Sequence, residues 1–129
     1  MTPRWISPRA LLLLHLESLA EHGGLIGAVD DGLLESALAR PQNLHAYEGT
    51  TDLARLAACN AVSINRNHPF KDGNKRMGFL AVGLFLGVNG FRLVADQRDS
   101  IEAMQSVADG SVDESAFADW IRSRMQPRG

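Results

Sequence analysis

The chain has 129 residues, of which 45% are apolar, a composition typical of one globular domain and too hydrophobic for a disordered chain. Its formal net charge of −2 argues against a protein built mainly to coat nucleic acid or anionic lipid, so we expect no direct nucleic-acid binding. The single cysteine, Cys59, excludes an internal disulfide and a cysteine-rich metal site, and its alanine-rich surroundings predict a buried thiol.

The apolar run at residues 11–14 is too short for a secretory signal or a membrane span, and polar residues follow it at once. We therefore expect a cytoplasmic protein with no membrane partner. No repeat, low-complexity segment or linker divides the chain, which predicts a single domain over residues 1–129.

The first part of the chain shows two helices and then a break. Ser7 followed by Pro8 is a typical helix start, and a glycine pair ends the apolar pattern that follows. A second, short helix, capped by one of two adjacent aspartates, should stop before Pro41. Residues 41–51 lack helical periodicity and contain turn-forming residues, so we predict a loop or short hairpin there.

Two longer helices are expected in the middle of the chain. The third should begin near Asp52 and end at residue 66 or 67, because Pro69 disfavours helical geometry at His68. The fourth, at about 75–89, is apolar almost all round, so it should be surrounded by its neighbours. Its three internal glycines each cost about 1 kcal/mol relative to alanine, which we interpret as a sign of close approach by neighbouring helices.

The remaining segment predicts two more helices. Residues 91–94 alternate weakly and are expected to be extended. A fifth helix fits 97–109, and a sixth fits 112–124, where Ser111 and Glu114 form a capping-box pattern. We therefore predict an all-α, compact single-domain fold of about six helices around a central buried helix, with one short loop or hairpin.

The most informative segment is the turn between the third and fourth helices, which reads His-Pro-Phe-Lys-Asp-Gly-Asn-Lys-Arg at 68–76. The N–H groups of residues 73–76 lie in the turn and the first helical turn, where they have no partners within the helix. The helix dipole adds about half a positive charge at the same end. These amides therefore predict an anion site, and phosphate is the common occupant of such sites.

The side chains around this turn suit a bound nucleotide. Lys75 and Arg76 can neutralise phosphate charge, and Arg66 lies just upstream. Asp72 is the only acid in this part of the chain, and a lone carboxylate beside phosphate-binding groups suits Mg²⁺. His68 belongs to the residue type that most often serves as a general base near neutral pH.

Each of these residues also has a simpler structural interpretation. His68 could be a helix-stop residue, the Asp72–Gly73 pair could be an ordinary turn, and the two cations could be a solvated helix start. Structural turns rarely need a histidine, an acid, an amide and paired cations within nine residues, so the combination favours a phosphate-binding catalytic site. Phe70, between polar residues, is expected to point into the core and hold the loop in place.

This segment resembles the signature of the Fic/Doc family, whose Fic form reads H-P-F-x-D/E-G-N-G-R-x-x-R. The resemblance extends over nearly the whole chain. Further segments look like the death-on-curing (Doc) toxin branch, and these are residues 6–8, 23–27, 33–41, 46–48 and 85–90. The resemblance implies a Fic fold with a short flap, and a nucleotide-dependent transferase that uses ATP and Mg²⁺.

Two positions depart from the Fic form, since Lys75 replaces a second glycine and Phe79 a second arginine. Fic enzymes transfer AMP from ATP to a protein hydroxyl, and a lysine should crowd the phosphate pocket that the glycine leaves open. Doc has the same lysine and lacks the last arginine. The resemblance therefore implies a protein kinase that transfers the γ-phosphate, with a threonine of elongation factor Tu as the family precedent for the target. Gly73 is the Fic-like residue where Doc motifs often have alanine, so AMP transfer is the alternative.

The resemblance also assigns roles to individual residues. His68 would deprotonate the target hydroxyl, and Asp72 would hold Mg²⁺. The nucleotide- and phosphate-binding residues would be Arg66, Gly73, Asn74, Lys75 and Arg76. The loop around residues 41–50 would be the flap that aligns the target segment.

Many Fic proteins carry an inhibitory helix with the pattern S/T-x-x-x-E-G/N, and the chain contains no match to it. Restraint would then come from a cognate Phd-like antitoxin supplied in trans, whose disordered tail folds into a groove of the toxin. The sequence thus predicts a toxin of a toxin–antitoxin system that arrests translation.

Two further classes of function fit this sequence less well. A catalytically idle Fic-fold binding module would not need the full set of loop residues. A metal-dependent ribonuclease usually needs several acids or a strongly basic surface, whereas this loop has one acid and the net charge is −2.

Overall fold

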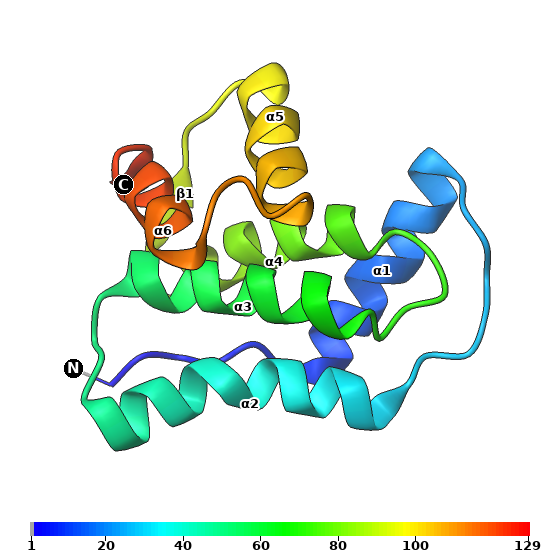
Figure 1. The fold of residues 1–129 in the computed structure, drawn as a ribbon, viewed down its shortest axis with the longest axis horizontal. Helices are drawn as coiled ribbons and strands as arrows, with labels where there is room; N and C mark the ends of the chain where they lie inside the picture. Colours follow the sequence, from blue (N-terminus) through cyan, green and yellow to red (C-terminus); the bar gives the residue numbers. More distant parts are fainter. Residues whose placement is uncertain (1) are drawn as a thin grey trace.

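The computed structural model describes residues 2–129 and shows six helices with a two-stranded antiparallel ribbon (Figure 1). The elements are α1 (Pro8–His22), α2 (Asp31–Glu48), α3 (Leu53–Asn67), α4 (Asn74–Val88), β1 (Phe91–Leu93), α5 (Gln97–Ala108), α6 (Glu114–Arg122) and β2 (Met125–Pro127). The all-helical fold predicted from the sequence is confirmed, as is the short extended segment after α4.

The helix α3 lies at the centre of the core and packs against α2, α4 and α6. In Figure 1, α2 runs alongside α3 on one side, and α5 and α6 cover the other. Ten of the fifteen residues of α3 are buried, and small side chains such as Ala57 and Ala61 let its neighbours approach closely. Cys59 has no exposed surface, as predicted, and burial raises the pKa of its thiol to about 11.

The prediction that the fourth helix is surrounded on all sides is wrong. Phe85 of α4 is fully buried, but Val88 is 39% exposed, and a Cβ placed on Gly83 would have no neighbour within 4 Å. The expected close approach holds at Gly78, where a Cβ would come within 3.1 Å of the Ala61 carbonyl oxygen on α3. The alanine-rich α3 occupies the central position instead, since small side chains allow several helices to pack around it.

The path of α2 is the largest departure from the sequence prediction. The expected stop before Pro41 and the loop at 41–51 are wrong, because the helix continues to Glu48 and ends at Gly49, which has φ +69°. Proline inside a helix removes one N–H donor and costs about 3 kcal/mol or more. Pro41 is fully buried, however, and Leu38, about one turn earlier, is buried as well. Burial of the helix face that carries Pro41 offsets the local cost of the proline. No local sequence pattern reveals this burial.

Helix starts follow the local sequence with one exception. Ser7 caps α1 and Pro8 is its first residue, as predicted. The capping box at Ser111 is wrong, because Asp113 caps α6. The Glu114 side chain pairs with Arg40 of α2 rather than bonding back to a cap.

The ribbon ties the end of the chain to the end of α4. The strands β1 and β2 are antiparallel, with Arg92 opposite Gln126, and the Arg128 N–H donates to the Gly90 carbonyl oxygen at 2.9 Å. The second strand was not predicted, since its three residues carry no alternating pattern. No helix among residues 2–129 combines the length and the apolar character needed to cross a bilayer.

Candidate functional site

Two residues with left-handed backbone geometry shape the loop between α3 and α4. His68 follows the last turn of α3 with φ +52°, and it is the only non-glycine residue in the described chain with a positive φ. Gly73 precedes α4 with φ +80° and offers no side chain to cap that helix. Backbone strain at a non-glycine residue is concentrated at functional sites. The amides at the start of α4, which no side chain caps, can bind an anion.

Asn74, the first residue of α4, holds the loop from within. Its Oδ1 accepts a hydrogen bond from the Phe70 N–H at 3.1 Å, and its Nδ2 donates to the Phe70 carbonyl oxygen at 2.9 Å. Phe70 is 3% exposed, as predicted, and stacks on the ring of His15 from α1, with the ring centroids 4.0 Å apart. The Asn74 side chain is therefore committed to the loop, and its backbone N–H is the group left for an anion.

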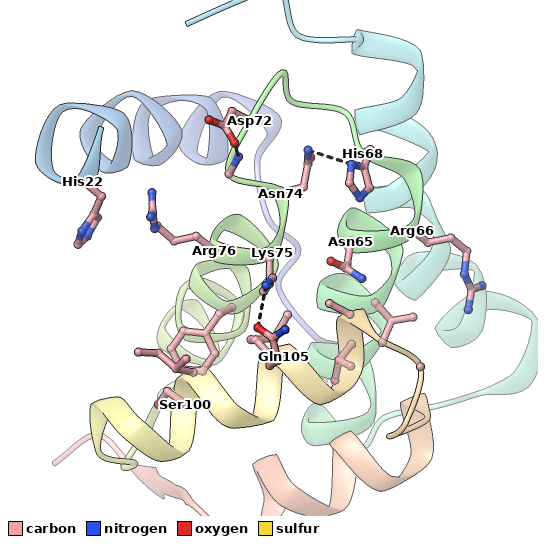
Figure 2. Close-up of a pocket in the computed structure, with 18 of the residues that line it drawn as sticks. His22, Asn65, Arg66, His68, Asp72, Asn74, Lys75, Arg76, Ser100 and Gln105 are labelled. Atoms are coloured by element: carbon pink, nitrogen blue, oxygen red, sulfur yellow. Dashed lines mark hydrogen bonds between the residues drawn. The ribbon is translucent and has the colours of Figure 1, made fainter. Parts of the chain in front are cut away.

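His68 is exposed, and its Nδ1 lies 3.4 Å from Asn74 Nδ2 (Figure 2). The two bonds to Phe70 identify Asn74 Nδ2 as a donor, so the contact is a hydrogen bond only when His68 Nδ1 accepts and the proton of the neutral ring is on Nε2. This contact is longer than a normal hydrogen bond and is therefore weak. To take a proton, the ring must either release Asn74 or change its tautomer.

Asp72 is exposed, and a backbone amide binds each of its two oxygens. Oδ1 accepts from the Gly73 N–H at 2.9 Å, and Oδ2 accepts from the Leu25 N–H at 3.1 Å. These bonds, that from Leu25 first, lower the pKa of the carboxyl group, which is therefore ionised at neutral pH. Within residues 2–129, no three His, Cys, Asp or Glu side chains gather to hold a metal ion. The site thus fits Mg²⁺ if phosphate oxygens and water complete its coordination.

All seven residues predicted for the site border one open pocket of about 1370 Å³ next to the loop and α5. They are Arg66, His68, Asp72, Gly73, Asn74, Lys75 and Arg76. Figure 2 shows Lys75 directed at Gln105 on α5, and its Nζ donates to Oε1 at 2.9 Å. The Arg76 guanidinium extends toward His22, whereas Arg66 points away from the other cations (Figure 2). Lys75 and Arg76 are therefore the cations best placed for a ligand in this pocket.

Several other residues that line the pocket escaped the sequence analysis. They come from three helices, and among them are His22, Asn65, Gln97, Ser100, Ile101, Met104 and Gln105. Asn65 lies about one turn before His68 on α3, a spacing that could have indicated it. Nothing local marks the α5 residues, because only the packing of α5 on α3 and α4 places them beside the loop.

The predicted position of the flap is wrong. Most of residues 41–50 belong to α2, and none of them lines the pocket. The segment beside the loop is the connection between α1 and α2, residues 23–30, where the Asp30 N–H donates to the Pro69 carbonyl oxygen at 2.9 Å. Residues 23–30 precede α2, whereas residues 41–50 contain its last turns. The sequence analysis predicted a short helix followed by a loop in place of this one long helix.

Six helices with a histidine-bearing loop at the start of α4 agree with the fold that the resemblance implied. The sequence model of the Fic/DOC family matches residues 5–86, which include the loop, all of α3 and most of α4, and the chain belongs to this family. It is 37% identical over 119 residues to the protein named Protein kinase doc of Escherichia phage P1, an alignment that covers 92% of this chain and 94% of that protein. It is 41% identical over 75 residues to Toxin Doc of Mycolicibacterium smegmatis, which covers 57% and 58% of the two chains.

Proposed function

We propose that the chain is a Doc-type toxin of a toxin–antitoxin system, which acts as a protein kinase and transfers the γ-phosphate of ATP to a hydroxyl side chain. The observation that carries this proposal is Lys75, which stands where the Fic signature has its second glycine and borders the pocket at the start of α4. A lysine there fills space that AMP transfer needs and offers its charge to phosphate oxygens. The similarity to Protein kinase doc over 92% of this chain supports the same reaction.

In this reaction the acceptor oxygen forms a bond to the γ-phosphorus, and the bond from that phosphorus to the bridging oxygen breaks, which releases ADP. His68 takes the proton of the acceptor hydroxyl as the general base. The N–H groups at the start of α4, together with Lys75 and Arg76, neutralise charge on the transferred group. Mg²⁺ held by Asp72 would add further neutralisation of the phosphate oxygens.

The acceptor protein approaches beside residues 23–30, which take over the aligning role expected of the flap. By family precedent the acceptor is a threonine of elongation factor Tu, and its modification arrests translation. A cognate Phd-like antitoxin restrains the toxin in trans, which agrees with the lack of the inhibitory motif in this sequence.

Transfer from differently labelled ATP tests the proposal. The protein is incubated with a cell lysate or purified elongation factor Tu and with ATP that carries the label at the γ or the α position. We expect label on protein from the γ position alone, and none with the His68→Ala variant, which controls for contaminating kinases. If neither label is transferred although ATP binds, the binding-module class is favoured.

AMP transfer is the second candidate, and Gly73 is the residue that favours it, since it matches the Fic form of the signature. Label retained from the α position would establish this reaction in place of the kinase. Mass spectrometry of proteins modified on expression separates the two candidates independently, because it identifies a phosphoryl or an adenylyl group and the residue that carries it.

A further inference from the structure

We propose that residues 23–30, here called the strap, position the Asp72 carboxylate, so that docking of the strap and binding of a metal–nucleotide complex reinforce each other. The inference rests on the proposed function for the nature of this ligand. The strap connects α1 to α2 and passes beside the loop between α3 and α4 (Figure 1).

Asp72 is held in place by one amide from the strap and one from its own loop. The Leu25 N–H donates to Oδ2 at 3.1 Å, and the Gly73 N–H donates to Oδ1 at 2.9 Å. Two donors on different oxygens restrict rotation of the carboxylate about its terminal bond. Each oxygen keeps a further lone pair, so the same carboxylate can still bind a metal ion.

A second contact ties the other end of the strap to the loop. The Asp30 N–H donates to the Pro69 carbonyl oxygen at 2.9 Å. Asp30 is also the N-cap of α2, since its Oδ1 accepts from the Leu33 N–H at 2.9 Å. This end of the strap is therefore fixed at the start of α2, and movement is easiest in the part around Leu25.

Two glycines allow the strap to lie directly against the loop. A Cβ on Gly24 would come 2.8 Å from Leu19 Cδ2 and 3.2 Å from Asp72 Oδ2, and the φ of +131° there already disfavours other residues. A Cβ on Gly27 would come 2.8 Å from both Cβ and Cγ of Lys71. A side chain at either position would have to displace the strap or the loop.

These contacts predict a coupling of definite sign. Groups that hydrogen-bond a metal-binding carboxylate orient it, and their loss typically weakens metal binding by about 10–100-fold. Because coupling between two binding equilibria is reciprocal, a metal–nucleotide complex at Asp72 stabilises the docked strap by the same factor. The strap is then more firmly docked with the metal–nucleotide complex bound than without it.

The variant Gly27→Ala is the sharpest probe of this coupling. Its backbone lies outside the left-handed region, so the substitution adds the contact with Lys71 without adding backbone strain. Gly32→Ala is the matched control, because the same added Cβ meets only Asp30 Oδ1, at 3.5 Å, an ordinary contact. Calorimetric titration with a non-hydrolysable ATP analogue should give about 10-fold weaker binding for Gly27→Ala in the presence of Mg²⁺. With EDTA in place of Mg²⁺, all three proteins should bind the analogue equally.

Hydrogen exchange tests the reciprocal effect on the strap of the wild-type protein. The amides of Leu25 and Asp30 should exchange more slowly with the Mg²⁺–analogue complex than with the analogue and EDTA, and Asp72→Asn should remove this difference. If the complex binds but these amides exchange at the same rate, or Gly27→Ala binds it as tightly as Gly32→Ala, the coupling is refuted and the kinase proposal stands. If the wild-type protein binds no nucleotide with or without metal, the proposed function fails, and the coupling fails with it.

Discussion

The loop at the start of α4 and the cluster of charges between α2, α3 and α6 use ionised side chains in opposite ways. In the cluster, the Glu114 side chain is 15% exposed, accepts from both terminal guanidinium nitrogens of Arg40 and lies 3.7 Å from Arg55 Nε. At the end of the loop, in the first turn of α4, Lys75 and Arg76 are exposed. Within residues 2–129 neither of them forms an ion pair. The cluster pairs its two cations with one carboxylate of the same chain, whereas the loop leaves its cations for a ligand.

This difference separates structural from functional charges. A half-buried ion pair holds helices together only when each charge has its partner, because an unpaired charge away from water is costly. A binding site needs charges that stay unpaired until the ligand arrives. Substitutions in the loop should therefore change activity with little effect on stability, and substitutions in the cluster should do the reverse.

The largest effect is expected at His68. Removal of the base should lower the rate of phosphoryl transfer by about 10²–10⁴-fold. His68→Asn is the matched variant, because asparagine tolerates the left-handed backbone of this position better than alanine does. His68→Ala and His68→Asn should both melt near the wild-type temperature in calorimetry, and both should lose phosphoryl transfer to the same extent. Transfer at the wild-type rate in either variant would remove His68 from the mechanism.

A smaller loss of activity is expected at Lys75. Lys75→Gly removes a charged contact to phosphate and enlarges the pocket, which should slow γ-transfer by about 10–100-fold, the effect of one hydrogen bond to a charged group. Gln105→Ala breaks only the exposed bond at 2.9 Å and should change the rate less than about twofold. Both rates are measured with ATP labelled at the γ position. Unchanged kinetics in Lys75→Gly would contradict the steric and electrostatic argument for this lysine.

The cluster should respond in stability rather than in activity. Glu114→Gln leaves Arg40 and Arg55 without their counter-charge and should lower the free energy of unfolding by about 1–3 kcal/mol. The control Glu102→Gln breaks an exposed pair with Arg98 and should cost less than about 0.5 kcal/mol. Urea denaturation measures both, and phosphoryl transfer by the folded proteins should be unchanged. A loss of transfer in folded Glu114→Gln would mean that the two regions are coupled.

The smallest effect is a pH dependence of stability that originates at His15. Burial lowers the pKa of His15, against an opposing pull from Asp72. The unfolded chain binds this proton more readily than the folded protein does. The stability that neutral His15 provides is therefore complete above the ordinary pKa of 6.5, and it is lost as the pH falls from there toward the lower pKa of the folded protein. Between about pH 7 and about pH 5, the melting temperature of the wild type should fall faster than that of His15→Phe, which keeps the stack on Phe70. Parallel curves would show that His15 does not titrate in this window.

Much of the candidate site could be predicted because its signals are local. Six of the seven predicted residues lie within residues 68–76, so any structure of this loop keeps them close together. Proline at 69 and glycine at 73 act on their immediate neighbours, and they mark the end of α3 and the start of α4. The Asn74 side chain could not be assigned in this way, because its bonds to Phe70 depend on how the whole loop folds back on itself.

The sequence by itself determined where most helices begin, the chemistry of the loop and its place at a helix N-terminus, since caps, prolines and glycines act over a few residues. Only the tertiary structure decided that α2 continues through Pro41, that α3 rather than α4 lies at the centre, that α5 completes the pocket, and that the strap lies against the loop. These outcomes depend on burial against helices distant in the chain, and the free energy of such burial can exceed the preference of any single residue.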